Sequence, residues 1–401
     1  MTDALPQAPG AVVPPVAPGQ PEAVAVAVAA SGWGQSFRVF QPRNLASWIF
    51  IWYLIAGAIE TFRFFRPGAE AVGTATLGGF VLFTLYALPW LILLRSIDRW
   101  TKIPGKLVLF AFLWGGLAAP FVIALPGNDA LLSLYGKVVS PGFAQDWGAG
   151  LAAPFSEELG KGIGILLLLY LAPRIIQSPF DGLITGAFVG LGFQVVEDVL
   201  YVVNNSLASF GGNQASSIVQ IGLVRGVSGL FSHTLFSAVF GAGLVFFLGT
   251  DSTRPRRGAG LGLMLLAMAL HGGWDVAGAL AGVVGITPFA FMAAIALLGL
   301  VTVILVIRRA SAGERTWMRT LLAPEVERGT ITDAELAALS GTARERRRFV
   351  KTATGYRGSK TARHVLDAAS DLAQALTISG GAETPNVAFA RSEVARVRTT
   401  A

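Results

Sequence analysis

The stretch APFSEELGKGIGILLLLYLA, residues Ala153–Ala172, joins charged side chains to a long apolar run. As a helix it is long enough to cross about 30 Å of hydrocarbon. Glu157, Glu158 and Lys161 stand near its head. An ionisable side chain inside a bilayer costs roughly 3 kcal/mol or more, so such a residue usually faces protein or water and usually serves a function. The stretch therefore predicts a membrane helix that carries part of a functional site.

The composition of the whole chain agrees with a membrane location. Of 401 residues, 53% are hydrophobic and 14% are charged, which is too apolar for an ordinary soluble domain of this length. The absence of Cys excludes disulfides, thiolate metal sites and a cysteine nucleophile. The net charge of +7 comes mostly from Arg in loops and in the C-terminal tail, and suits an anionic membrane surface. We see no basic-aromatic nucleic-acid module and predict no nucleic-acid partner.

Apolar stretches long enough to span a bilayer recur between Leu45 and Ile307, and we predict an all-α polytopic transmembrane bundle of about eight spans. The predicted spans are 45–62, 71–94, 106–125, 149–172, 180–203, 221–249, 259–281 and 287–307. The domain expected to carry the activity is 45–307, with its core at 149–281.

The two ends of the chain differ from this central domain. Residues 1–40 are rich in Pro and Ala, and we expect a disordered leader. Residues 308–401 are polar and basic, and we expect a helical tail. In this tail, TDAE (Thr332–Glu335) has the pattern of a capping box at a helix start. A helical stripe of apolar residues follows at Val365, Ala369, Leu372 and Leu376.

The charges of the loops predict the orientation in the membrane. Basic residues follow the even-numbered spans, whereas the loops after spans five and seven carry no charge. By the positive-inside rule, the loops after even-numbered spans and both termini should be cytoplasmic. The basic residues concerned are Arg95, Arg99, Lys102, Lys106, Arg174, Arg254, Arg256, Arg257, Arg308 and Arg309.

Ionisable residues inside the spans are the candidates for the site. They fall in spans four to seven and are Glu157, Glu158, Lys161, Glu197, Asp198, Arg225, His233, His271 and Asp275. At about 1.5 Å of rise per residue, Glu157, Glu197, His233 and His271 lie roughly 10 to 17 Å from the outer ends of their spans. Four groups from four helices should therefore meet at one level in the outer half of the bilayer.

Helical spacing predicts which of these residues pair locally. Lys161 lies four residues after Glu157 and three after Glu158, so it can be the counter-ion of either carboxylate. Asp275 lies four residues after His271 and can orient its imidazole.

Two further residues near these pairs have roles that the sequence leaves open. Asp198 should point about 100° away from Glu197 on a helix. Arg225 could either position a site residue or reach lipid headgroups.

Three motifs in this region resemble a known family. EELGK is similar to the EExxK motif, FQVVE (Phe193–Glu197) to the FxxxE motif, and HGGWD (His271–Asp275) to the HxxxD motif of the PrsW-type intramembrane proteases. That family belongs with the CAAX-protease and bacteriocin-processing glutamate-dependent membrane proteases. The resemblance covers roughly residues 149–281, and Arg225 with His233 also resembles the family pattern. The family often has Asn where this chain has Asp198.

The resemblance implies peptide-bond hydrolysis in or next to a membrane segment, in some members of an anti-sigma factor, and a bacterial inner-membrane location. We therefore expect two partners. One is a membrane-protein substrate, with a single-pass anti-sigma factor as a candidate, and the other is the lipid bilayer. Glu157 is the expected general base, assisted by Glu158, while Glu197 holds the water from the opposite side. His271 with Asp275 is expected to donate to the oxyanion. The expected supporting residues are Lys161, His233 and Arg225.

A zinc ion is the alternative to a metal-free mechanism. Glu157, Glu197, His233 and His271 could supply oxygen and nitrogen ligands to one zinc ion with an open position, although the chain has no HExxH. By analogy with the superfamily, we favour the metal-free glutamate mechanism and no cofactor.

Two other functions use the same residues. A proton-coupled transporter or channel would use the buried Glu and His groups as a relay, but the polar motifs have no counterpart in spans one to three. A non-catalytic membrane scaffold would not need the EExxK glutamates, which are intact.

Overall fold

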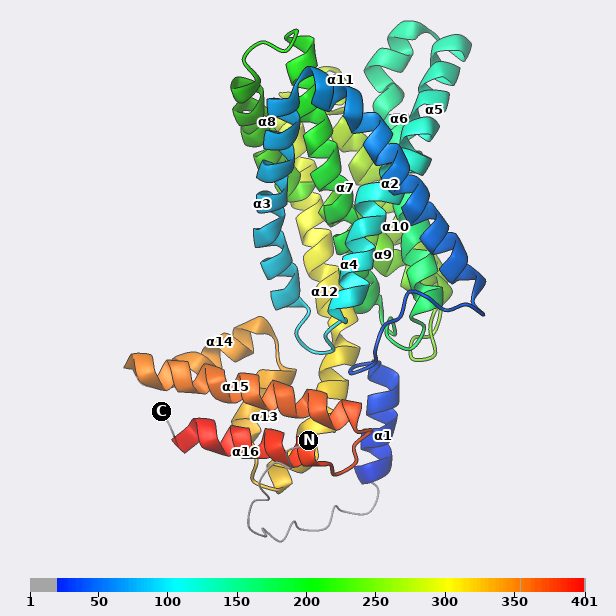
Figure 1. The fold of residues 1–401 in the computed structure, drawn as a ribbon. Helices are drawn as coiled ribbons and strands as arrows, with labels where there is room; N and C mark the ends of the chain where they lie inside the picture. Colours follow the sequence, from blue (N-terminus) through cyan, green and yellow to red (C-terminus); the bar gives the residue numbers. More distant parts are fainter. Residues whose placement is uncertain (1–19, 354, 400–401) are drawn as a thin grey trace. The chain divides into compact units, whose positions relative to one another are not determined.

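The computed structural model describes residues 20–353 and 355–399, and every regular element in these ranges is a helix (Figure 1). The predicted all-α fold is confirmed. The chain divides into two compact units. The membrane unit is Gln35–Gly313, and the tail unit joins the residues up to Gly34 with Glu314–Ala401.

The membrane unit consists of helices that follow one another through short connections. In chain order they are α2 (Leu45–Ala71), α3 (Gly73–Ile97), α4 (Gly105–Leu113), the π-helical η1 (Trp114–Ala124), α5 (Leu125–Val138), α6 (Pro141–Leu171), α7 (Pro179–Ala208), α8 (Gln214–Ser228), the 3₁₀ turn η2 (Gly229–Phe231), α9 (His233–Leu248), α10 (Arg257–Asp275), α11 (Ala277–Val284) and α12 (Pro288–Glu327), whose residues from Glu314 on belong to the tail unit.

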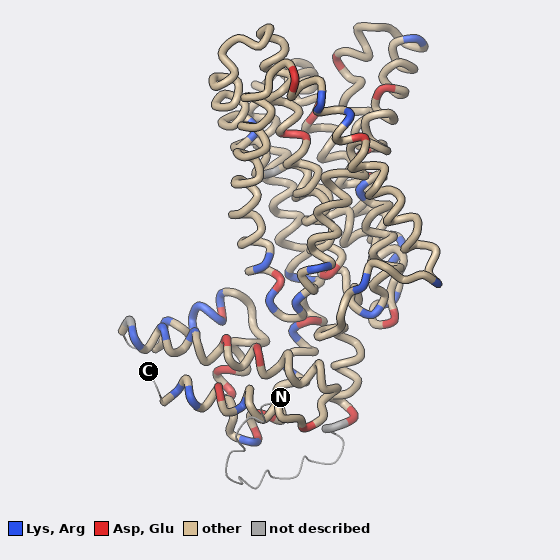
Figure 2. Tube along the Cα trace, viewed as in Figure 1, with Lys and Arg blue, Asp and Glu red and all other residues tan. Residues whose placement is uncertain are grey.

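Six helical segments of the described chain are long and apolar enough to cross a membrane, and a seventh is added if the bent pair α10 and α11 counts as one span. The segment α6 is not in this set, and it carries Glu157, Glu158 and Lys161 in its middle. With α6, these segments correspond to the predicted spans. Figure 2 shows that charged residues are sparse along the helices of the membrane unit. The chain is therefore a multi-pass membrane protein.

The third predicted span, 106–125, is too short, and most of the stretch between it and the fourth predicted span, 149–172, is helical. The helix continues through η1 and α5 to Val138, and α6 begins at Pro141, so α5 and α6 form a helical hairpin. The new start has a clear local cause. Ser140 is extended and its side chain accepts a hydrogen bond from Phe143 N, while Pro141 occupies the first turn.

Two predicted spans are interrupted close to the candidate residues. Predicted span 221–249 is broken between α8 and α9 by η2 and Ser232, in a stretch that contains Gly229. Predicted span 259–281 bends by 81° between α10 and α11. As a result His233 is the first residue of α9 and Asp275 is the last residue of α10. Both polar side chains therefore stand at helix ends inside the membrane unit.

Glycines bring the backbones of α7 and α9 into direct contact. A Cβ atom on Gly186 would lie 2.1 Å from Ser237 O, and one on Gly190 would lie 2.3 Å from His233 O. Neither position tolerates a side chain without a shift of backbone. This close packing sets the height of α9 against α7, and with it the position of His233.

The tail unit contains α1 (Gln20–Ser31), α13 (Asp333–Ser340), α14 (Ala343–Thr352), α15 (Gly355–Ile378) and α16 (Pro385–Thr399). The predicted capping box is present, since the Thr332 and Glu335 side chains each bond the other's backbone N–H. The predicted stripe of α15 is buried along its length.

The segment predicted as a disordered leader, 1–40, lies partly outside the described residues, which begin at 20. Its described part contains the helix α1, which differs from the prediction. Ala is frequent there, Pro21 lies in the first turn, where Pro is tolerated, and Glu22 suits the positive end of the helix dipole.

Candidate active site

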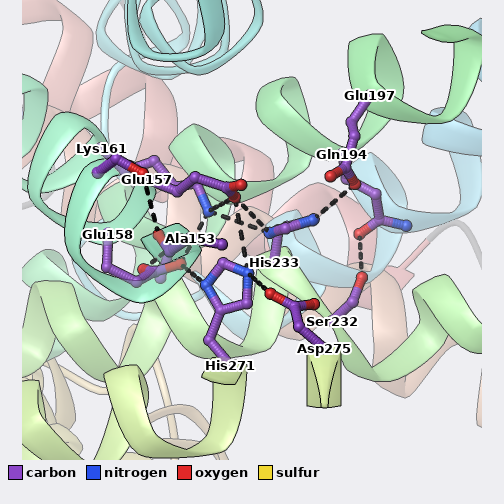
Figure 3. Close-up of polar contacts among 12 residues, drawn as sticks. Ala153, Glu157, Glu158, Lys161, Gln194, Glu197, Ser232, His233, His271 and Asp275 are labelled. Carbon is purple, nitrogen blue, oxygen red and sulfur yellow. Dashed lines mark hydrogen bonds and ion pairs between the residues drawn. The ribbon is translucent and has the colours of Figure 1, made fainter. Parts of the chain in front are cut away.

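Side chains from α6, α7, α9 and α10 meet inside the membrane unit (Figure 3). They are almost completely buried. The exposed fraction is 5% for Glu157, 0% for Glu158 and Lys161, 4% for His233 and 1% for His271. Buried charges are costly unless they are paired, so the contacts among these groups decide what the site can do.

Lys161 lies at the centre of the cluster. Its Nζ lies 2.8 Å from Glu158 Oε1 and 3.6 Å from Glu157 Oε2. The same ammonium donates to His233 Nδ1 at 3.0 Å and lies 4.0 Å from the centre of the Phe193 ring. The sequence predicted that Lys161 could pair with either glutamate, and the structure pairs it more closely with Glu158.

The two glutamates of α6 differ in how they are held. Glu158 accepts hydrogen bonds from Lys161 and from Ser237 Oγ (3.1 Å). Glu157 accepts one on Oε1, from Asn128 Nδ2 at 3.3 Å, whereas its buried Oε2 has no hydrogen-bond partner among the described residues. Glu157 Oε2 is thus the free carboxylate oxygen at the centre of the cluster.

The two histidines face this oxygen from α9 and α10. Glu157 Oε2 lies 3.8 Å from His233 Nδ1 and 3.6 Å from His271 Nε2. His233 Nε2 donates to Glu197 Oε2 at 2.8 Å, and His271 Nδ1 donates to Glu158 Oε1 at 3.0 Å. A carboxylate can only accept, so these contacts place a proton on His233 Nε2 and on His271 Nδ1.

The predicted pair on α10 is present. Asp275 Oδ2 lies 3.4 Å from His271 Nε2, one helical turn away. The Asp275 side chain is 24% exposed, so this pair connects the buried cluster with its surroundings. His271 therefore has a carboxylate on either side, Glu158 at Nδ1 and Asp275 near Nε2.

Arg225 of α8 ties two adjacent carboxylates of α7 together. Its Nη2 donates to Glu197 Oε2, and its Nε donates to Asp198 Oδ1 at 2.5 Å. The Arg225 side chain is 14% exposed and lies over the Tyr201 ring. Of the two alternatives for Arg225, the structure shows contact with site residues. Asp198, whose role the sequence left open, shares that arginine with Glu197.

Three of the four expected metal ligands come together. One donor atom each from Glu157, His233 and His271 lie within 4.8 Å of one another. This set suits zinc, because it offers one carboxylate oxygen and two imidazoles, and the His271 Nδ1 bond to Glu158 resembles the contact that orients a ligating histidine. The unpartnered Glu157 Oε2 also suits a ligand. Glu197 is not in this group and lies on the far side of His233.

Several residues of the site were missed from the sequence. Asn128 contacts Glu157, and Ser156 Oγ donates to Asn128 Oδ1. Asn128 lies in the segment predicted as a loop, so no signal pointed to it. Gln194 of α7 accepts from Ser232 Oγ (3.3 Å) and Thr234 Oγ1 (3.2 Å), next to the site. Gln194 stands inside FQVVE, where its place one turn before Glu197 was the available signal.

Comparison with known proteins supports the family resemblance. The family model "PrsW family intramembrane metalloprotease" matches residues 103–307. A protein named Protease PrsW from Geobacillus kaustophilus is 28% identical over 180 residues, which are 44% of this chain and 69% of that protein. Protease PrsW from Clostridioides difficile is 25% identical over 200 residues, 48% of this chain and 77% of that protein. No solved structure matches the chain significantly.

The family match covers half of the chain and all of the clustered side chains, from Glu157 to Asp275. The expected enzyme class, a membrane endopeptidase, is confirmed by the same match. An intramembrane protease requires a membrane-protein substrate. This chain belongs to the PrsW family of intramembrane proteases.

Proposed function

We propose that the protein hydrolyses a peptide bond in or next to a membrane segment of its substrate, and that Glu157 activates the attacking water. The observation that carries the proposal is the free, buried Oε2 of Glu157, which faces His271 Nε2 and Lys161 Nζ at 3.6 Å each. A carboxylate oxygen in such a position can accept a proton from water.

In this reaction the water oxygen bonds to the scissile carbonyl carbon while its proton moves to Glu157. The carbon–nitrogen bond then breaks, and Glu157 returns the proton to the leaving amine nitrogen. Glu158 supports this step indirectly, because it holds both Lys161 and His271. Without Glu158, neither group would keep its distance from Glu157.

The developing oxyanion needs a donor close to Glu157. We assign this role to His271 in its doubly protonated form, in which Nδ1 donates to Glu158 and Nε2, the ring nitrogen that faces Glu157 and Asp275, carries the second proton. We assign Glu197 to the opposite side of the water, held there by His233 and Arg225. His233 and Arg225 would then act as positioning residues.

The donor set also fits a metal ion. Glu157, His233 and His271 would hold it. A zinc ion bound there would lower the pKa of its water and polarise the carbonyl. Against this, His233 Nδ1 already accepts from the Lys161 ammonium, so Lys161 would have to move for that nitrogen to bind a metal. We therefore favour the glutamate mechanism without metal.

We propose a single-pass membrane protein as substrate, with an anti-sigma factor as the first candidate from the family resemblance. We further propose the bacterial inner membrane, with both termini in the cytoplasm. The support is the basic residues at the loops after α3 and α9.

The test is to compare new protein N-termini in membranes of cells that express the native chain or Glu157→Gln, with and without envelope stress. The matched control is Glu70→Gln, on the exposed end of α2. We expect cuts near membrane segments with the native chain and the control, and none with Glu157→Gln. Identical profiles for all three folded proteins would contradict the proposal and favour the transporter or scaffold functions.

A further inference from the structure

A small cavity opens beside the two carboxylates at the centre of the proposed mechanism. Its volume is about 90 Å³, and both Glu157 and Glu197 lie on its wall. The rest of the wall comes from α2, η1, α5 and α7; it is mostly apolar, with Phe64, Phe121 and Val196 among its residues, and it includes the amide side chain of Asn128. The wall of the cavity thus combines two carboxylates with a majority of apolar and aromatic side chains.

This composition limits what the cavity can hold. An apolar cavity next to two carboxylates favours a group that is apolar itself but attached to something polar. A substrate residue adjacent to the scissile bond meets both conditions, since its peptide group would lie at the carboxylates and its side chain would extend between the aromatic rings. A residue far from the scissile bond could not place its side chain there.

The size of the cavity limits the side chain. An apolar cavity of roughly 150 Å³ admits benzene, and this one is smaller, at about 90 Å³. The Phe121 ring lies 5.2 Å from the Phe64 ring and 5.8 Å from the Phe65 ring, so this side of the wall is a packed aromatic cluster. Ala and Val side chains therefore fit, whereas Phe does not fit without a rearrangement of that cluster.

We infer that this cavity is the specificity subsite for one substrate residue next to the scissile bond and that it selects a small aliphatic side chain. The inference rests on the proposed proteolysis and adds to it the class of residue at the cut. Discrimination by a hydrophobic pocket is worth about tenfold or more for a misfit of a few carbons.

The experiment uses the substrate cut that the N-terminal profiling identifies. Each residue flanking the cut is replaced in turn by Ala, Val, Leu and Phe, and cleavage by the full-length native protein in liposomes is followed by mass spectrometry. At one flanking position we expect Ala and Val to be cleaved about tenfold faster than Phe. The other flanking position should show a weaker preference.

Enlarging the cavity should relax this preference. Val196→Ala and, on a partly buried part of the wall, Leu200→Ala should each raise the relative rate for Leu and Phe several-fold. The matched control Val202→Ala removes the same atoms from a buried position of α7 outside the cavity and should leave the preference unchanged. Two enlarging variants guard against one that fails to fold.

Equal cleavage of all four side chains at both positions would overturn the inference, and so would an unchanged preference in both folded enlarging variants. Neither result would affect the proposed proteolysis. Failure of the proteolysis itself would appear earlier and differently, as the absence of any cut that depends on Glu157.

Discussion

Lys161 Nζ lies 2.8 Å from Glu158 Oε1, and both side chains are fully buried. This pairing separates two adjacent glutamates into a held carboxylate and a free one. Glu158 bonds Lys161, His271 and Ser237, whereas one buried oxygen of Glu157 forms no hydrogen bond with any described residue. The chemistry proposed for Glu157 depends on Glu158 acting as the main counter-ion of Lys161.

Removal of Lys161 should destabilise the fold. Lys161→Met leaves Glu158 without its ammonium partner, and breaking a buried pair in this way costs about 3 to 5 kcal/mol. We expect a lower thermal unfolding midpoint in detergent, with partial recovery in the double variant Lys161→Met, Glu158→Gln. An unchanged midpoint in the single variant would show that the pair contributes nothing to stability.

Arg225 should matter because it contacts two carboxylates with one planar group. Arg225→Gln removes two charge-assisted hydrogen bonds from Glu197 and Asp198. A loss of about 1.5 to 3 kcal/mol corresponds to a cleavage rate about 13- to 160-fold lower. Arg225→Lys should recover little, because a single ammonium does not reproduce the fork. Full activity in Arg225→Lys would contradict the bridging role.

Metal content decides between the two mechanisms. Lys161 donates to His233 Nδ1, the nitrogen that a metal would need. We therefore expect the purified native protein to hold much less than one zinc ion per chain and to keep its activity with a strong chelator. Elemental analysis by mass spectrometry measures this directly. About one zinc per chain, lost in His233→Gln, would establish the metal mechanism instead.

The glycine contact between α7 and α9 should be sensitive to a single methyl group. Gly190→Ala would place a Cβ atom 2.3 Å from His233 O, so α9 must move at the residue that enters the site. We expect a lower unfolding midpoint and a loss of cleavage. Gly262→Ala on α10 is the control, because nothing lies within 4 Å of its new Cβ atom. Equal behaviour of the two variants would contradict this role of Gly190.

Stability should depend on pH through Asp98, in the loop between α3 and α4. Burial raises the pKa of the Asp98 carboxyl to about 7, against about 3.9 in an unfolded chain. Between these values the folded state holds more protons than the unfolded state, so the free energy of unfolding falls as pH rises from about 4 to about 7.

Asp98→Asn should flatten this part of the pH profile, because the amide oxygen can still accept from Ile103 N and Arg95 without titrating. Unfolding midpoints in detergent from pH 4 to 8 measure the effect, and Asp251→Asn, at an exposed loop residue, is the control. A profile for Asp98→Asn that matches the native one would contradict the assignment.

Local spacing predicted part of the site. The contacts of Lys161 with Glu158 and of His271 with Asp275 follow from one turn of helix, and they are present at 2.8 and 3.4 Å. The convergence of Glu157, His233 and His271 also agrees with the prediction that several spans meet. Their catalytic roles remain proposals, since contacts alone do not establish them.

Contacts between distant segments were not predictable in the same way. Asn128 reaches Glu157 only because α5 continues the third span and packs in a hairpin with α6, whereas the predicted third span ended at 125 and left Asn128 outside it. The breaks before His233 and after Asp275 were also missed. Hydrophobicity alone measures the length of an apolar run, not whether its backbone hydrogen bonds are continuous.

The direct contact of α7 with α9 also restricts the direction from which a polypeptide can approach Glu157. At Gly186 and Gly190 not even one methyl group fits between the two backbones. A substrate strand therefore cannot pass between α7 and α9 unless the two helices separate. The cavity beside Glu157 is lined instead from α2, η1, α5, α6 and α7, and none of the described residues on its wall belongs to α9. A lateral route past η1 would leave the α7 and α9 seam closed throughout the catalytic cycle.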